Sequence, residues 1–250
     1  MKFFTSLSTG HSGTKWLAQV LNTSDDITCH HELKLNTHRS YLRFRFGKNL
    51  WKYAEQFDYD NYLNPGAYTK YISHLQHSRS KYVGDIQSWN PTTLTTFRGT
   101  IANPEIVIHL VRNGIQVVHS LHNTNLDTTK DEPFFHNALK LQCEHFGIQF
   151  LEDQDPFYYW CLYWKVVNCA EAKHKATVSY RLEDLTRNIR MLEEVFPNCR
   201  YKEVPEQNRK ITGNRDPEYL WNSWDVEQRS IFYTTCRNTM ISYGYEIPRD

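Results

Sequence analysis

The hydrophobic positions of the chain fall into short continuous runs that alternate with helix-like spacings. Residues 106–111 (IVIHLV) form a nearly unbroken apolar run, which is typical of a central strand in a parallel sheet. Shorter β-compatible runs at 2–8, 27–30, 82–86 and 176–180 predict further strands. The pattern therefore predicts a sheet in which 106–111 is the most deeply buried strand.

Apolar residues at helical spacing lie between and after these runs. The expected helices are at 16–21, 91–97, 115–121, 189–196 and 225–244. Asn113 can cap the helix at 115–121, and the last helix starts near Asp225 with Gln228 in capping-box position. Strands that alternate with helices predict an α/β fold, in which a central parallel sheet is flanked by helices on both faces.

Length and composition favour one globular domain. The chain has 250 residues, of which 40% are hydrophobic and 23% charged, and this balance excludes a disordered chain, a coiled coil and a collagen. No repeat, low-complexity tract or linker divides the chain, so we expect a single domain over 1–250. A basic aromatic insertion is expected at about 36–81, because residues 39–82 hold eight Lys/Arg, three Asp/Glu and eleven aromatic side chains.

Charge and cysteine content argue against several classes of protein. Lys and Arg number 29 against 28 Asp and Glu, and this near balance makes a nucleic-acid partner unlikely. No apolar run approaches the ~18–20 residues of a membrane span, and residues 1–6 turn polar too early for a signal peptide. The six cysteines are scattered without a CxxC pair, which favours reduced, mostly buried thiols over a zinc site. We therefore expect a cytoplasmic protein.

A glycine-bearing loop joins the first expected strand to the first helix. Its residues are Gly10, His11, Ser12, Gly13, Thr14, Lys15 and Trp16. Glycines allow backbone N–H groups to surround an anion, and a helix N-terminus adds about half a positive charge. Hydroxyls and a cation at the same helix start favour an oxyanion site over a plain strand–helix turn, which is the alternative interpretation.

A second motif follows the most deeply buried strand. Arg112 lies directly after that strand, and Ser120 comes about two helical turns after Asn113, on the same helix face. Open α/β sheets bind ligands at the carboxyl ends of their strands, and a guanidinium suits a dianionic phosphate. Arg112 is therefore a candidate phosphate ligand, with a structural ion pair as the alternative.

Taken in order along the chain, these segments resemble the motifs of sulfotransferases. Residues 12–17 (SGTKWL) resemble the 5′-phosphosulfate loop of that family, and 111–120 resemble its 3′-phosphate motif with the same Arg-to-Ser spacing. Two later segments, 180–185 (YRLEDL) and 240–245 (MISYGY), are similar to family segments as well. The resemblance spans most of the chain, and residues 36–81 match nothing in it.

The resemblance implies a P-loop-like three-layer sandwich. It also implies transfer of a sulfuryl group from 3′-phosphoadenosine 5′-phosphosulfate (PAPS) to a hydroxyl or amine, without a metal. A Walker A motif would place Ser or Thr directly after Gly-Lys to bind Mg²⁺. Here Trp16 follows Lys15, and Arg112 rather than an acidic residue ends the buried strand. Both features argue against an ATP-dependent phosphotransferase.

Catalytic roles follow from the same resemblance. Glu32 is the expected general base, with His31 as the runner-up, because many family members carry an acidic catalytic residue about one strand beyond the loop. Lys15 is expected to provide the permanent positive charge that stabilises the leaving 5′-phosphate. His11 stands where the family usually has Lys or Arg, and it is expected to donate a hydrogen bond or to act as a cation when protonated.

Other residues carry weaker expectations. Tyr180 is assigned to the cofactor site with its family-like segment, and Arg209 and Lys210 are candidates for a basic loop over the 3′-phosphate, with a solvated loop as the alternative. Three aromatic residues at helical spacing are expected in the core: Trp160, Tyr163 and Trp164. Two histidines, His119 and His122, are expected on the surface of a helix.

The acceptor is expected to be a small molecule or a glycan, and the sequence leaves its identity open. The basic aromatic insertion is expected either to form the acceptor site or to cap the domain with a small core of its own. Two alternative functions stay open: a P-loop phosphotransferase that uses ATP and Mg²⁺, and a non-catalytic nucleotide-binding protein that lost its chemistry at His11.

Overall fold

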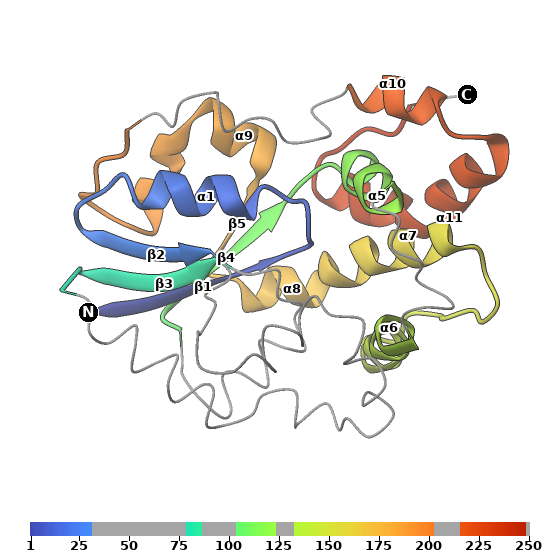
Figure 1. The fold of residues 1–250 in the computed structure, drawn as a ribbon, viewed down its shortest axis with the longest axis horizontal. Coiled ribbons are helices and arrows are strands. Elements are labelled where there is room, and N and C mark those ends of the chain that lie inside the picture. The colour runs from blue at the N-terminus through green and yellow to red at the C-terminus, as the bar shows by residue number, and fades with distance from the viewer. Residues whose placement is uncertain (32–78, 87–103, 124–132, 203–215, 249–250) are drawn as a thin grey trace.

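A five-stranded parallel sheet forms the centre of the molecule (Figure 1). The computed structural model describes residues 1–31, 79–86, 104–123, 133–202 and 216–248. Its strands are β1 (Lys2–Ser8), β2 (Ile27–His31), β3 (Tyr82–Ile86), β4 (Ile106–Val111) and β5 (Val178–Arg181). They lie in the order β2-β3-β1-β4-β5, and each neighbouring pair is parallel. All five carboxyl ends therefore meet at one edge of the sheet.

Helices cover both faces of this sheet, as the sequence pattern predicts. Helices α1 (Thr14–Leu21) and α9 (Leu182–Arg187) lie over one face, and α8 (Ala170–Lys175) lies on the other (Figure 1). The helix expected at 189–196 is a shorter 3₁₀ helix, η3 (Ile189–Glu194). The α/β fold with a central parallel sheet flanked by helices is confirmed.

The side chains of β4 explain its unbroken apolar sequence. Ile106, Ile108 and Leu110 are buried in one cluster with residues of α1 and η3. Val107, which points the other way, is buried against Ala172 of α8. Because both faces of β4 are covered, every residue of the strand has to tolerate burial, which is the reason why polar and apolar positions do not alternate here.

A helical half lies beside the sheet, beyond the carboxyl end of β4 (Figure 1). It contains α5 (Gly114–His122), α6 (Pro133–His145), α7 (Pro156–Val167), α10 (Pro217–Asn222) and α11 (Val226–Ser242). Trp160 and Trp164 of α7 are buried there against α5 and α11, so their assignment to the core is confirmed. The capping box of Asp225 and Gln228 is present at the start of α11.

Several sequence expectations are settled by the described residues, and others fall outside them. All six cysteines are unpaired and five are buried, as expected. The helix expected at 91–97 and nearly all of the insertion at 36–81 lie outside the described residues. Among the described helices, none has the length and apolar character needed to cross a membrane.

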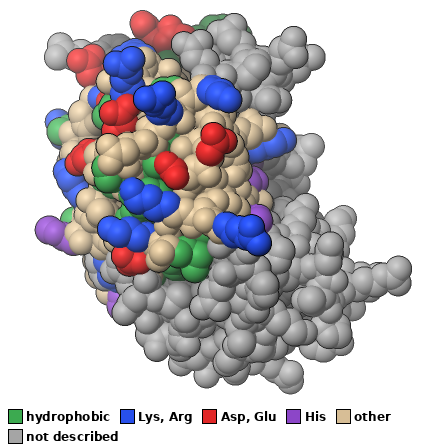
Figure 2. All heavy atoms as spheres, turned by 90° about the vertical axis from the view of Figure 1, so that its left-hand side faces the viewer, with side chains coloured by type: hydrophobic (Ala, Val, Ile, Leu, Met, Phe, Trp, Pro, Cys, Tyr) green, Lys and Arg blue, Asp and Glu red, His purple; other side chains and the backbone are tan. Residues whose placement is uncertain are grey.

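Charged side chains are mixed on the face seen in Figure 2. On its described part, Lys and Arg lie interspersed with Asp and Glu, over the strands and helices at the left of Figure 1. A nucleic-acid backbone is usually met by a basic stripe or patch on one face. This side of the molecule shows no such patch among the described residues.

Candidate functional site

The glycine-bearing loop connects β1 to α1 at the carboxyl edge of the sheet. His11 and Gly13 both have positive φ angles, 63° and 84°. A Cβ atom on Gly13 would lie 2.7 Å from side-chain atoms of Leu182, so the positive φ favours glycine there and a larger residue would displace Leu182. Gly13 is also the N-cap of α1 and provides no side-chain cap, and the first turn of α1 has no acidic residue. The positive end of α1 is therefore not neutralised by a side chain of its own first turn.

Arg112 connects the end of β4 to this loop. The residue is 4% exposed, and its Nη1 donates to the backbone carbonyl of His11 at 2.9 Å. Its Nε donates to Oε1 of Gln116, one helical turn further along, at 3.1 Å. The guanidinium is thereby held against the loop from the side of α5.

Ser120 meets the same loop residue. Its Oγ lies 2.6 Å from Nδ1 of His11, and the serine comes from the last turn of α5. The predicted spacing from Arg112 to Ser120 therefore does bring both residues to the loop, and His11 is the residue that contacts both. Asn113 caps α5 by accepting from the backbone N–H of Ile115 at 2.9 Å, which sets the direction of the helix that carries Ser120.

Burial and neighbouring charge shift the pKa values of this cluster. His11 is exposed on one side, but partial loss of solvent around its ring and the positive charge of Arg112 lower its pKa below the usual range. Burial also lowers the pKa of Arg112, while the nearby Glu183 carboxylate acts in the opposite direction. Arg112 stays charged, since arginine starts far above neutral pH. The cluster thus holds one permanent cation beside a neutral histidine.

His31 approaches the loop from β2, one of the two edge strands of the described sheet. Its Nε2 lies 3.1 Å from Oγ1 of Thr14, the first residue of α1. The predicted runner-up for the general base is therefore in contact with the loop. Glu32, the first choice, lies just outside the described residues.

The remaining predicted residues differ in where they lie. Lys15 is exposed on α1, while Ser12 is buried and hydrogen-bonded to Thr9. Trp16 is buried in the core cluster against the sheet.

Tyr180 is also in that core, and its hydroxyl donates to the carbonyl of Met191 at 2.7 Å, so the structure does not bring it to the loop. Arg209 and Lys210 lie outside the described residues.

Tyr163 packs against the core, as its spacing predicted, and it also contacts the loop. Its hydroxyl accepts from the backbone N–H of Gly10 at 3.3 Å. Its helical spacing with Trp160 and Trp164 indicated burial, and nothing in that spacing showed that the hydroxyl of Tyr163 reaches the loop. His119, expected on a helix surface, is half-buried and stacks on Trp224.

Chemically, the arrangement is suited to an anion rather than to a metal ion. Hydroxyls, a guanidinium and a helix start converge on the loop, and these are donors to oxyanions. Within the described residues, no three His, Cys, Asp or Glu side chains gather where they would hold a metal ion. Independence from metals stays a prediction.

Solved structures align with this chain. The sulfotransferase domain of the olefin synthase from Synechococcus PCC 7002 aligns with a TM-score of 0.52 at 12% identity, over 99% of this chain and 95% of that one. The chain has a sulfotransferase fold. A mouse sulfotransferase, SULT7A1 in complex with PAP, aligns with a TM-score of 0.46 at 14% identity, over 97% and 87% of the two chains. No protein-family model and no curated protein sequence matches the chain.

Proposed function

We propose that this protein is a sulfotransferase that moves a sulfuryl group from PAPS to a hydroxyl or amine acceptor. One observation carries the proposal: His11 of the β1–α1 loop contacts both Arg112 and Ser120. The loop proposed for the 5′-phosphosulfate and the two residues proposed for the 3′-phosphate thereby lie together at the carboxyl edge of a parallel sheet. The shared fold with a sulfotransferase domain supports the same conclusion.

We assign the PAPS site to the loop that contains His11 and to the two residues that contact His11. The loop from Gly10 to Thr14 and the start of α1 take the 5′-phosphosulfate, and Lys15 and Trp16 continue that segment. Arg112 and Ser120 take the 3′-phosphate. Lys15 supplies a permanent positive charge for the leaving 5′-phosphate, while the loop N–H groups donate hydrogen bonds to it.

His31 or Glu32 serves as the general base. In the transfer, the acceptor oxygen or nitrogen forms a bond to sulfur while the bond from sulfur to the 5′-phosphate oxygen breaks. The 5′-phosphate leaves with the bonding electron pair, and the proton of the acceptor passes to the base. The contact between His31 and Thr14 supports His31 in this role, since it holds the imidazole beside the loop.

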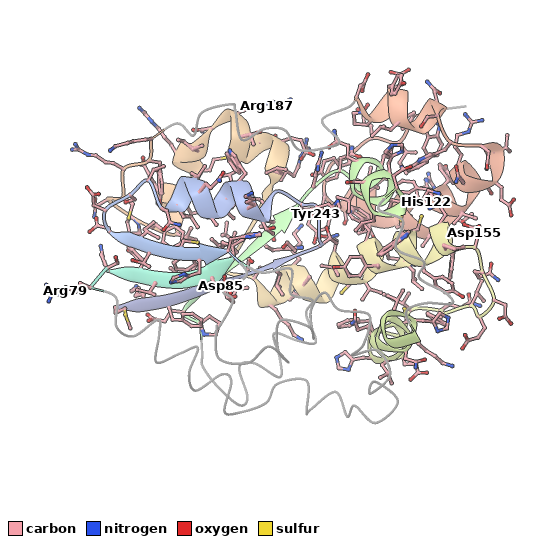
Figure 3. The ribbon with its side chains drawn as sticks, in the orientation of Figure 1. Arg79, Asp85, His122, Asp155, Arg187 and Tyr243 are labelled. Carbon is pink, nitrogen blue, oxygen red and sulfur yellow. The ribbon has the colours of Figure 1, made fainter. Side chains whose placement is uncertain are left out.

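Calorimetric titration with adenosine 3′,5′-bisphosphate, without metal, tests the proposal. We expect wild type and Arg187→Ala to bind alike, because Arg187 is an exposed arginine on α9 (Figure 3). Arg112→Ala is expected to bind about 30-fold more weakly, as is usual when one partner of a buried charge contact is removed. Binding of ATP with Mg²⁺ but not of the bisphosphate would indicate a phosphotransferase instead.

A rate measurement separates an enzyme from a binding protein. If the bisphosphate binds, Lys15→Ala should lower turnover from PAPS by roughly 10²–10³-fold, as the loss of one preorganised charge-stabilising group does elsewhere. Tight bisphosphate binding with no turnover on a panel of phenol, alcohol, amine and sugar acceptors would favour the non-catalytic alternative.

A further inference from the structure

The chain after α11 returns to the sheet beside Arg112. We refer to residues 243–248 as the C-terminal tail. Tyr245 of this tail is 6% exposed, and its hydroxyl donates to Oε2 of Glu183 at 2.7 Å. The same hydroxyl lies 3.4 Å from the carbonyl oxygen of Val111, the last residue of β4. The tail therefore reaches the residue that precedes Arg112.

Glu183 contacts the backbone on the other side of Arg112. It lies in the first turn of α9, and its Oε1 accepts from the backbone N–H of Asn113 at 3.1 Å. Since Asn113 is also the N-cap of α5, one carboxylate holds both the residue after Arg112 and the start of the helix that carries Ser120. The negative charge is favourable at this position, near the positive end of α9.

The position of Tyr245 is itself fixed by a second arginine. Nη1 of Arg181 donates to the carbonyl of Gly244 at 3.1 Å, and its guanidinium lies over the Tyr245 ring at 4.6 Å. Gly244 has a φ of 71°, which lets the chain turn back toward the sheet directly after the helix. The tail is thus held to the carboxyl end of β5, next to β4 in the sheet.

Charge and protonation favour the same arrangement. Burial, and next the Glu183 carboxylate, raise the pKa of Tyr245 far above its usual range, so the phenol stays neutral and keeps its proton. Glu183 in turn favours the charged form of Arg112, which burial alone disfavours. The Tyr245 hydroxyl, the Glu183 carboxylate and the Arg112 guanidinium thus lie near one another at the end of β4 as a hydrogen-bond donor, an anion and a cation.

We propose that Tyr245 and Glu183 are positioning residues for the phosphate site. They fix the main chain on both sides of Arg112, and so place its guanidinium and Ser120 for the 3′-phosphate. Neither residue is assigned a contact with the substrate. This inference rests on the proposed function for its ligand, and on the hydrogen bonds at Val111 and Asn113 for its geometry.

The test compares Tyr245→Phe with Tyr243→Phe. Both variants remove a hydrogen-bonded tyrosine hydroxyl from the same tail, but Tyr243 faces His109 rather than Arg112, between the sheet and the helical half (Figure 3). Each is titrated with adenosine 3′,5′-bisphosphate and with adenosine 5′-phosphate, which lacks the 3′-phosphate. We expect Tyr245→Phe to lower the preference for the bisphosphate about fivefold, and Tyr243→Phe to leave it unchanged.

A double-mutant cycle adds a control against a general loss of structure. In an Arg112→Ala background, Tyr245→Phe should have no further effect on the preference for the bisphosphate, since residues that act through one another are not additive. An unchanged preference in Tyr245→Phe, or an equal loss in Tyr243→Phe, would overturn the proposal.

A measurement without ligand separates this inference from the proposed function. The Nε–H resonance of Arg112, assigned with Arg112→Lys, reports the position of the guanidinium in the free protein. We expect Tyr245→Phe to shift it and to speed its hydrogen exchange, and Tyr243→Phe to do neither. If wild type binds no bisphosphate but the resonance responds in this way, the positioning role stands and the proposed function fails. An unperturbed resonance in Tyr245→Phe contradicts the positioning role whatever the ligand result.

Discussion

Two histidine–serine pairs are associated with β4 and the helix after it, and they differ in what surrounds them. At the loop, Nδ1 of His11 lies 2.6 Å from Ser120, and the permanent cation of Arg112 donates to the backbone carbonyl of the same histidine. Within the strand, Nδ1 of His109 lies 3.3 Å from Ser179 of β5, and its ring is fully buried. The first pair lies at the edge where ligands of such sheets bind, and the second lies inside the fold.

Neighbouring groups provide hydrogen-bond partners for both ring nitrogens of the inner pair's histidine. Nε2 of His109 lies 3.0 Å from Oδ1 of Asn168, whose amide donates to the carbonyl of Trp164 at 2.8 Å. Nδ1 then accepts from the hydroxyls of Ser179 and Tyr243, the latter at 3.4 Å. Each polar atom of the ring has a partner within the protein, and no permanent charge takes part in these bonds. The inner pair is enclosed within the fold, whereas the loop pair is the one that we propose to meet an anion.

The largest expected difference between the pairs is in stability against acid. Burial lowers the pKa of His109 to about 4, with a smaller contribution from Lys173 and an opposing one from the bond to Asn168. In the unfolded chain the same ring titrates near 6.5, so between about pH 6.5 and 4 the unfolded state binds more protons. Stability is therefore expected to fall as pH drops through this window, by up to about 3 kcal/mol from this residue.

Urea unfolding at several pH values between 7 and 4 measures this effect. His109→Gln keeps a polar side chain of similar reach and does not titrate, so its stability should depend less steeply on pH than that of wild type. Parallel pH profiles for the two proteins would show that His109 is not the group responsible. Because other carboxylates and histidines titrate equally in both proteins, the difference between the profiles isolates this residue.

A smaller effect separates the two serines. Ser120→Ala is expected to weaken binding of adenosine 3′,5′-bisphosphate about fivefold, the size of one hydrogen bond of ~1 kcal/mol. Ser179→Ala removes the matching hydroxyl from the inner pair. It is expected to leave the affinity unchanged and to lower the free energy of unfolding by ~1 kcal/mol. Calorimetry and urea unfolding of both variants provide the comparison, and equal affinities would mean that Ser120 is not a phosphate ligand.

Local signals in the sequence were sufficient for much of the fold. The unbroken apolar run of β4 predicted a strand covered on both faces, and Asp225 and Gln228 predicted the start of α11. Arg112 and Ser120 could be placed together because a strand end and two helical turns have fixed lengths. Each of these predictions depends on residues that are near one another in the sequence.

Contacts between distant segments could not be predicted in the same way. Tyr180 and Arg181 are neighbours on β5, but a strand directs them to opposite faces, so Tyr180 enters the core and Arg181 holds the tail. The segment was recognised, but its spacing did not show which of the two side chains enters the core and which contacts the C-terminal tail. Glu183 and Tyr245 are 62 residues apart, and no spacing indicates that the second donates to the first.

The smallest expected effect concerns the protonation of His11. In the free protein its lowered pKa keeps the ring neutral at pH 7, because of partial burial and then of Arg112. A bound phosphate dianion favours the imidazolium, so binding should take up a proton, and affinity should rise about two- to threefold as pH falls from 7.5 to 6.5.

His11→Asn is the matched control, since asparagine tolerates the φ of 63° and does not titrate. Protonation of the ligand's own phosphates affects both proteins equally, so the ratio of their affinities reports His11 alone. A ratio that stays constant with pH would mean that His11 acts only as a neutral hydrogen-bonding group, which would make the loop pair more like the inner one.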